Sequence, residues 1–486
     1  MNDTWNQLVA VLPPIFTCLA VIGVMAAIAC KRNHGSAVAI TVVGLNLALV
    51  SLLAVIAVTP IEVTPLFVVD DYAVFFWAVI LVAALATCTF AGSYFEGLDD
   101  NREEFYILVA SSVLGGMALV ASRHFASLFI GLELLSVPLY GMIAYTYRER
   151  QSLEAGFKYM VLSGAASSFL LFGMALLYAA SGHLDYEGLA VALQSGASGH
   201  AWVLMGVGMI LVALTFKLSL VPFHVWTPDV YEGAPAPVST FLATVSKTAV
   251  FALLMRFFFL APVAHDPWLL TLVGVIAFLS MFAGNLLALR QTNIKRILGY
   301  SSIAHIGYLL TVIVAGIPLS IEATGVYLAT YVGTTLGAFG VVSLVSSPFA
   351  GRDAAHLDHY RGLYWKRPIL AVSMAIMMLS LAGIPLTMGF IGKFYILSVA
   401  VAAGLWWLVA GIIIGSGIGL FYYLRVMALL FMERPADARE PAAIGGMGQT
   451  AGTVVIWLLA AVTIIVGIYP TWLIDLVGAS SIAGIG

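Results

Sequence analysis

Long runs of apolar residues, separated by short polar segments, make up most of this 486-residue chain. An α-helix needs roughly 20 mostly apolar residues to cross about 30 Å of hydrocarbon. The pattern therefore predicts an all-α polytopic membrane protein with about fourteen transmembrane helices, near residues 9–30, 37–59, 72–92, 104–122, 125–145, 155–180, 201–222, 237–260, 268–288, 298–316, 322–345, 369–399, 405–430 and 452–474.

The composition supports this class. Hydrophobic residues make up 62% of the chain and charged residues 9%, with a mean hydropathy of +1.04, which leaves too little polar surface to cover a soluble domain. The first residues, MNDTWNQ, lack a basic stretch, so we expect the first span to be retained rather than cleaved as a signal. Cys18, Cys30 and Cys88 have no metal-ligand spacing and are interpreted as packing residues. The net charge of −3 gives no reason to expect a nucleic-acid partner.

The basic residues orient the chain, because cytoplasmic loops of membrane proteins carry an excess of lysine and arginine. Only Arg123 and Arg256 fall near one side of the predicted bundle. Arg425 lies at the opposite end of its span, where the loops carry Lys31, Arg32, Arg102, Arg148, Arg150, Arg290, Lys295, Arg296, Arg352, Arg361, Lys366, Arg367, Arg434 and Arg439. We therefore expect the basic loops in the cytoplasm and both termini outside.

A few ionisable residues lie within the predicted spans: Glu133, Lys158, Lys217, Lys247 and Lys393. On insertion scales, a charge at the centre of a membrane helix costs about 2.5 to 3.5 kcal/mol. Because a cost of this size is seldom retained without a function, these residues are the candidates for a working site.

Two predicted spans are interrupted by proline, the seventh at Pro222 and the twelfth around Pro385, and each carries a lysine near the break. Proline leaves backbone groups unpaired, which at membrane depth implies a hydrated cavity. Broken helices at corresponding positions are typical of transporters with inverted repeats. We therefore predict a single membrane domain, 1–486, with helices 1 to 3 in residues 1–100, a five-helix repeat at 104–260, an inverted five-helix repeat at 268–430, and helix 14 at 452–474.

Glu133 lies among apolar residues in LFIGLELLSVPLYG, where it either joins two helices as a structural ion pair or tunes a neighbouring lysine. At a separation of about 6 Å and an effective dielectric of about 20, its attraction to Lys217 would be roughly 2.8 kcal/mol. Lys217 and Lys247 come from adjacent spans, and hydroxyl residues flank Lys247 in FLATVSKTAVF. We favour a proton relay through both lysines over the alternative that they only join helices by hydrogen bonds.

Further ionisable groups extend the predicted relay. Lys393 follows the break in the twelfth span and is assigned to proton transfer. Lys158 either takes part, extends toward the cytoplasmic headgroups, or pairs with Glu154. His224 and His305 can each accept and donate a proton, although a lone histidine is often only a satisfied polar side chain.

Four ordered motifs run through the chain: GLELLSVPLYG, FKLSLVPFHVWTPDVYEGAPAPVS, TNIKRILGYSSIAHIGYL and LSLAGIPLTMGFIGKFYIL. In these motifs the chain resembles the antiporter-like subunits of respiratory complex I, the bacterial proton-translocating NADH:quinone oxidoreductase. The resemblance implies a hydrophilic axis through the membrane arm formed by Glu133, Lys217, Lys247 and Lys393. Sibling antiporter-like subunits of complex I and stand-alone antiporter subunits usually carry tryptophan and aspartate where this chain has Leu132 and Asn293, so these departures weaken the stand-alone alternative.

The resemblance implies a translocase subunit that moves protons while NADH oxidation and quinone reduction proceed on other subunits. We expect FMN, iron–sulfur clusters and ubiquinone or another quinone on those partners, and no cofactor or metal on this chain. Other membrane-arm subunits and the lipid bilayer are the expected partners, and the bacterial inner (plasma) membrane, with both termini periplasmic, is the expected location. The loop 433–449 is a candidate docking segment. A subunit of a stand-alone cation/proton antiporter and a purely structural membrane-arm subunit remain as alternatives.

Overall fold

The computed structural model describes residues 2–96, 101–194, 201–261, 267–346, 353–433, 447–479 and 482. Within these ranges the chain is almost entirely helical, and the only strands form a short antiparallel hairpin in which Ile61 faces Val69. The elements are α1 (Asn2–Ala10), α2 (Leu12–Cys30), α3 (His34–Val55), β1 (Ile61–Thr64), β2 (Phe67–Val69), α4 (Asp71–Phe95), α5 (Glu104–Val120), α6 (Phe125–Ile143), α7 (Arg150–Ser181), α8 (Tyr186–Gln194), α9 (Ala201–Lys217), α10 (Trp226–Gly233), α11 (Ala236–Phe241), the π-helix η2 (Leu242–Ser246), α12 (Lys247–Leu260), α13 (Pro267–Leu289), α14 (Ile294–Ala315), α15 (Leu319–Val345), the 3-10 helix η5 (Leu357–Tyr360), α16 (Leu363–Lys366), α17 (Pro368–Ala382), α18 (Met388–Ala402), α19 (Trp406–Phe431), α20 (Met447–Ile468) and α21 (Thr471–Gly478).

The predicted helical membrane fold is confirmed. Eleven helices of the described chain are long and apolar enough to cross a membrane. The shorter apolar helices α5 and α9 occupy the fourth and seventh predicted spans, and α17 with α18 occupies the twelfth. Arg352, Arg434, Arg439 and most of the loop 433–449 lie outside the described residues.

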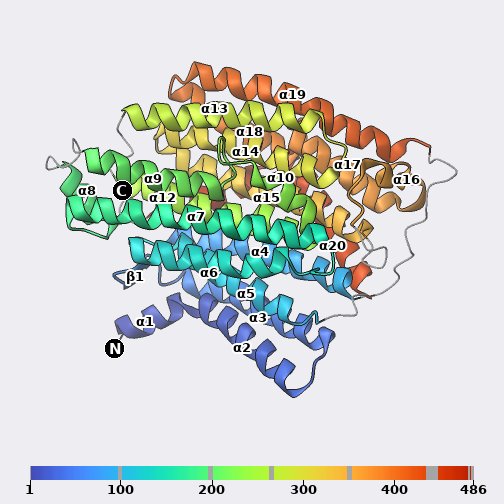
Figure 1. Cartoon of the computed structure of the whole chain (residues 1–486), viewed down its shortest axis with the longest axis horizontal. Helices are drawn as coiled ribbons and strands as arrows, with labels where there is room; N and C mark the ends of the chain where they lie inside the picture. Colours follow the sequence, from blue (N-terminus) through green and yellow to red (C-terminus); the bar gives the residue numbers. More distant parts are fainter. Residues whose placement is uncertain are drawn as a thin grey trace.

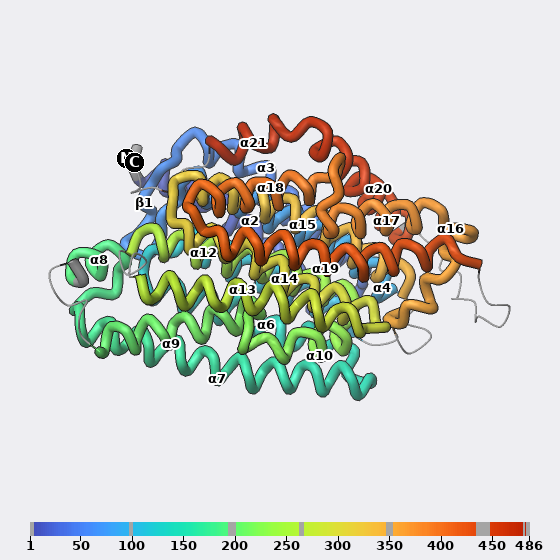
Figure 2. Tube along the Cα trace, turned by 90° about the horizontal axis from the view of Figure 1, so that it is seen from above, coloured from blue at the N-terminus to red at the C-terminus, as the bar shows by residue number. Residues whose placement is uncertain are grey.

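The helices run side by side along the long axis of the molecule, with α8 and β1 at one end and α16 at the other (Figures 1 and 2). The segment from α11 to α12 and helix α14 are buried over their apolar cores, whereas fewer than a third of the residues in the apolar cores of α2, α3 and α20 are buried. A helix that is apolar all round is suited to the interior of such a bundle. The central helices α12, α14 and α15 carry Lys247, His305 and the tyrosines around them, so the polar groups lie where other helices shield them from lipid.

The break in the seventh helix contains Pro222, as predicted, and begins before it. Helix α9 ends at Lys217, and α10 resumes only at Trp226. Ser219, within the break, has a left-handed backbone with φ of 63°, a conformation that costs a non-glycine residue energy. The indole nitrogen of Trp226 donates to the carbonyl of Phe216 at 3.1 Å, which satisfies one of the carbonyls that a helix end leaves free.

The twelfth helix breaks at the predicted place. Helix α17 ends at Gly383, whose φ of 83° is a conformation that glycine adopts readily. Leu386 is also left-handed, with φ of 72°, so each broken helix contains one such non-glycine residue. The two breaks place Lys217 and Lys393 beside irregular backbone. The inverted relation between the two groups of five helices stays a prediction.

Candidate functional site

Lys217 is buried at the end of α9 and is held by serines from two other helices. Its ammonium group donates to Ser136 Oγ of α6 at 2.6 Å and to Ser163 Oγ of α7 at 2.7 Å. Ser163 Oγ lies 2.8 Å from the hydroxyl of Tyr140, and the ring of Tyr159 lies 5.6 Å from Lys217 Nζ. A buried cation needs such polar and aromatic neighbours, because hydroxyl dipoles and a ring face replace part of its hydration.

Glu133 lies close to this lysine site without forming an ion pair with it. The carboxylate is half-buried on α6 and accepts a hydrogen bond from Ser167 Oγ at 2.5 Å. Ser167 and Ser163 are four residues apart on α7 and therefore occupy one face of that helix. Glu133 and Lys217 therefore bond different serines of the same face of α7, and no direct hydrogen bond or ion pair joins them among the described residues.

Lys247 begins α12 directly after the π-helical turn η2 and is fully enclosed. Its ammonium group donates to Ser302 Oγ of α14 at 2.6 Å, and the ring of Tyr231 lies 6.0 Å away. Ser302 Oγ is 2.6 Å from the hydroxyl of Tyr331. Of the hydroxyl residues that flank Lys247, Thr244 bonds the carbonyl of Thr240 at 2.7 Å, and Thr248 has no hydrogen-bond partner among the described residues.

His305 bridges two tyrosine hydroxyls one turn further along α14. Nδ1 is 2.7 Å from Tyr327 Oη, and Nε2 is 3.2 Å from Tyr423 Oη. The imidazole ring centre also lies 5.4 Å from that of Tyr331 and 5.7 Å from that of Tyr308. A neutral imidazole that accepts at one nitrogen and donates at the other can pass a proton between such hydroxyls.

Lys393 lies at the break between α17 and α18. Its ammonium group donates to the main-chain carbonyls of Leu381 and Ala382, both at 2.9 Å. These are carbonyls of the last turn of α17, which no helical N–H can reach, and the negative end of the helix favours a cation there. The ring of Tyr308 lies 5.5 Å from Lys393 Nζ. Helix α14 therefore connects Lys247 to Lys393 through Ser302, His305 and its aromatic neighbours.

Aromatic side chains of helix α10 lie near both Lys217 and Lys247. Tyr159, beside Lys217, lies 4.9 Å from the ring of Trp226 at the start of α10. Tyr231, beside Lys247, belongs to the same helix. Among the described residues no protein hydrogen bond joins Lys217 to Lys247, so a proton passing between them needs water at the break.

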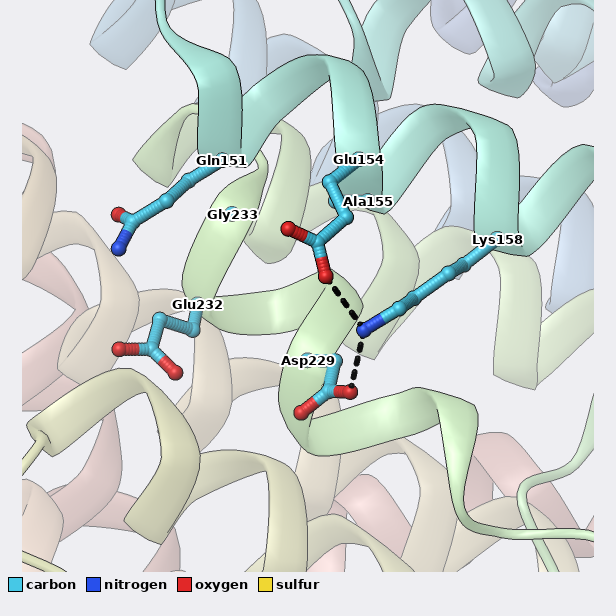
Figure 3. Close-up of a pocket in the computed structure, with 7 residues that line it drawn as sticks. All are labelled: Gln151, Glu154, Ala155, Lys158, Asp229, Glu232 and Gly233. Atoms are coloured by element: carbon cyan, nitrogen blue, oxygen red, sulfur yellow. Dashed lines mark hydrogen bonds and ion pairs between the residues drawn. The ribbon is translucent and has the colours of Figure 1, made fainter.

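Lys158 lies in a separate polar pocket near the ends of α7 and α10 (Figure 3). It pairs with Glu154 at 2.7 Å and with Asp229 at 3.0 Å, as one of the sequence alternatives anticipated. Asp229 also binds Arg296 of α14 at 2.9 Å, and Arg296 reaches Glu232 at 2.8 Å. The pocket has a volume of about 140 Å³ and opens at the surface of the protein. Its partly exposed ion pairs connect α7, α10 and α14.

His224 lies within the break after α9 and is half-buried. Its Nδ1 is enclosed and has no hydrogen-bond partner among the described residues. The structure therefore brings together Glu133 and Lys217 through serines, and Lys247, His305 and Lys393 through α14, whereas His224 and Lys158 lie apart from these hydrogen bonds.

The sequence interpretation missed the neutral groups of the site. Two serines of the small-residue segment LSGAASS, Ser163 and Ser167, bond Lys217 and Glu133. The available signal was spacing, since these serines lie four residues apart on one helix face and Ser136 follows Glu133 by one turn. The tyrosines could not be distinguished from packing residues in so apolar a chain.

The site as a whole can hold and transfer protons. It contains amines that can ionise, a carboxylate, an imidazole and hydroxyls at hydrogen-bonding distance, all shielded by apolar helices. Among the described residues no cluster of three or more histidine, cysteine or acidic side chains is placed to hold a metal ion.

Comparison with known proteins gives matches along the whole chain. A family model described as NADH:quinone oxidoreductase/Mrp antiporter, TM, matches residues 122–419. A protein of Chromohalobacter salexigens named NADH-quinone oxidoreductase subunit N is 56% identical over 97% of this chain and 98% of its own length. A protein of the same name from Ectopseudomonas mendocina is 52% identical over 98% of this chain and 96% of its own length. A chain of respiratory complex I from Thermus thermophilus with bound aureothin is 32% identical and matches with a TM-score of 0.82, covering 96% of this chain and 100% of that chain.

Proposed function

The chain belongs to the NADH:quinone oxidoreductase and Mrp antiporter membrane-subunit family, and from this premise we propose how it moves protons. It is a membrane subunit of an NADH-quinone oxidoreductase, of the subunit N class, and as such forms part of a translocase. We assign translocation to a relay of Glu133, Lys217, Lys247, His305 and Lys393. The observation that carries this assignment is the set of three lysines, two of them buried and Lys393 partly buried, each held by hydroxyl or carbonyl oxygens and none by a carboxylate.

The hydrogen-bond partners of these lysines explain why they suit proton transfer. A carboxylate in direct contact would hold the ammonium proton by Coulomb attraction, whereas serine hydroxyls and carbonyls stabilise it less. A lysine held by neutral oxygens can therefore release its proton when a nearby charge changes. Glu133 is placed to make that change at Lys217, because both groups bond serines one turn apart on the same helix, α7.

The proposed sequence of events begins outside this chain. NADH oxidation and quinone reduction on partner subunits change the electrostatic state that reaches Glu133. When Glu133 moves away from Lys217, the ammonium group gives its proton through water to the amine of Lys247. The proton then passes along α14, through Ser302, Tyr331 and His305, to Lys393, which discharges it outside.

The setting of the relay completes the proposal. We place the chain in the bacterial inner membrane with both termini periplasmic, next to other membrane-arm subunits and lipid. Flavin, iron–sulfur clusters and quinone belong to the partner subunits in this account. His224 and Lys158 are assigned to proton uptake at the cytoplasmic side, since one lies in the break after α9 and the other in the open pocket of Figure 3.

Substitution in the assembled complex tests the assignment. Lys217→Met removes the ionisable amine but keeps most of the apolar stem, and Glu133→Ala removes the tuning carboxylate. Proton pumping in proteoliposomes should fall by about tenfold or more in both, because one interaction with a charged group is lost in each. Arg361→Met, in a cytoplasmic loop away from the spans, is a control for the loss of a basic side chain. Unchanged pumping and quinone reduction in both variants would exclude the proposed relay.

A stand-alone cation/proton antiporter is the second candidate, since the matching family model includes Mrp antiporters. Such a protein would exchange sodium for protons without NADH. Vesicles that contain this chain without its redox partners decide between the two, because sodium-dependent proton flux would support the antiporter and its absence supports the redox-coupled subunit.

A further inference from the structure

A fully buried ion pair lies near the outer end of α12, away from the relay. The two guanidinium NH groups of Arg256 donate to the two carboxylate oxygens of Asp70 at 2.8 and 2.7 Å, and its Nε donates to the carbonyl of Val120 at 2.9 Å. Arg256 and Asp70 expose 0% and 1% of their side chains. This is the two-pronged geometry that fixes both the distance and the orientation of the partners.

A tyrosine makes a second contact with the same helix. Tyr72 lies two residues after Asp70, and its hydroxyl donates to the main-chain carbonyl of Ala252 at 2.9 Å. Its ring also lies 5.1 Å from the guanidinium carbon of Arg256. Ala252 and Arg256 are one turn apart on α12, so the first turn of α4 holds two consecutive turns of that helix. Asp70 itself caps α4 by accepting from the N–H of Ala73 at 2.9 Å, which makes the holding element rigid.

The contacts of Arg256 and Tyr72 with α12 affect Lys247, which lies at the opposite end of that helix. Lys247 is the first residue of α12 and directly follows the π-helical turn η2. A π turn accommodates one extra residue in a helix. If the π turn moved along the helix, every residue between its old and new positions would rotate by about 100° about the helix axis. Arg256 follows Lys247 by nine residues, which corresponds to about 13.5 Å along the helix axis. A fixed point at Arg256 therefore sets the direction in which Lys247 projects.

We propose that Asp70, Tyr72 and Arg256 are positioning residues that hold α12 in the register in which Lys247 meets Ser302. The inference rests on the proposed proton relay, because it assigns these residues a role through Lys247. It also accounts for Arg256, one of the two basic residues on the side of the bundle that is poor in basic residues. Asp70 neutralises the charge of Arg256, so this arginine can lie on that side as a structural residue that orients α12.

Tyr72→Phe is the most informative variant. Removal of Asp70 or Arg256 would leave an uncompensated buried charge and disturb folding for that reason alone. Loss of the tyrosine hydroxyl removes one hydrogen bond to α12 and keeps the ring. Tyr106→Phe is the matched control, since Tyr106 of α5 is equally buried and its hydroxyl has no hydrogen-bond partner among the described residues. Ser302→Ala removes the hydrogen-bond partner of Lys247 directly, so it shows how loss of the Lys247–Ser302 contact affects pumping.

The measurement is the ratio of protons pumped to quinone reduced, as a function of pH, in the assembled complex in proteoliposomes. Tyr72→Phe should lower the ratio by about fivefold, the effect of one hydrogen bond, and should shift its pH profile in the same direction as Ser302→Ala. Tyr106→Phe should retain the parent ratio and profile. A structural role alone would reduce the amount of assembled complex without moving the pH profile.

Two results would overturn the inference. One is an assembled Tyr72→Phe complex with the parent ratio and pH profile. The other is failure of both the Tyr72→Phe and the Arg256→Lys complexes to assemble, which would assign these residues to folding only. If only Tyr72→Phe fails to assemble, the ratio and pH profile of the Arg256→Lys complex decide instead. Lys217→Met separates this inference from the proposed function. If Lys217→Met stops pumping while Tyr72→Phe has no effect, the proposed relay is supported and the positioning role of Tyr72 is contradicted.

Discussion

The side chains of the relay differ in how visible they are in the sequence. Glu133, Lys217, Lys247 and Lys393 could be identified because a charge within an apolar run is costly and therefore conspicuous. Serine is common in membrane helices, where its hydroxyl can bond the preceding turn, so Ser163 gave no comparable signal. The attraction between Glu133 and Lys217 was predicted from charge alone, whereas the serine hydroxyls that bond each of them were not predicted.

Ser163→Ala tests the residue scale. The substitution removes one of the two oxygens that accept from Lys217, and a hydrogen bond to a charged group contributes about 1.5 to 3 kcal/mol. We expect proton pumping to fall by about tenfold or more, with its pH dependence altered. Ser168→Ala on the same helix is the control, because Ser168 is exposed and bonds only the carbonyl of Gly164. Equal pumping by the two variants would show that Ser163 contributes nothing to the lysine site.

At the scale of the helices, the sequence predicted the fourteen spans and both breaks because length, apolarity and proline are local properties. The first break contains Pro222, as predicted, but helix α9 already ends at Lys217, before the proline. Its end depends on Trp226, which binds the carbonyl of Phe216 from α10, and such a contact between segments cannot be derived from local pattern. The π turn before Lys247 likewise left no recognisable signal in the sequence.

The second break provides a prediction at this scale. A Cβ on Gly389 would lie 1.9 Å from the carbonyl oxygen of Ser380, so alanine there must push α18 away from α17. We expect Gly389→Ala to destabilise the subunit by about 1 to 3 kcal/mol and to disturb the carbonyl contacts of Lys393. Thermal unfolding and pumping of the complex measure both effects. Gly417→Ala is the control because a Cβ there meets nothing within 4 Å, and equal behaviour of the two variants would refute close packing at the break.

At the scale of the whole molecule, the buried centre and the exposed outer helices point to work within a larger membrane assembly. Fewer than a third of the residues in the apolar cores of α2, α3 and α20 are buried, which suits contact with lipid or partner subunits. Which neighbour covers which helix is a property of the assembly and could not be predicted from one chain. We expect the protein, extracted in mild detergent, to copurify with an assembly that contains flavin and iron–sulfur clusters. Recovery as an active sodium/proton exchanger without them would favour the antiporter candidate.

The most direct test of the account is the number of protons pumped per quinone reduced by a complex that carries Lys247→Met. Lys247 lies between the lysine at the first break and the imidazole and lysine beyond it, so every proton on the proposed route passes this amine. The account predicts a lower ratio or a parallel loss of pumping and quinone reduction, with assembly intact. A complex that assembles normally and keeps the parent ratio and rate would contradict it.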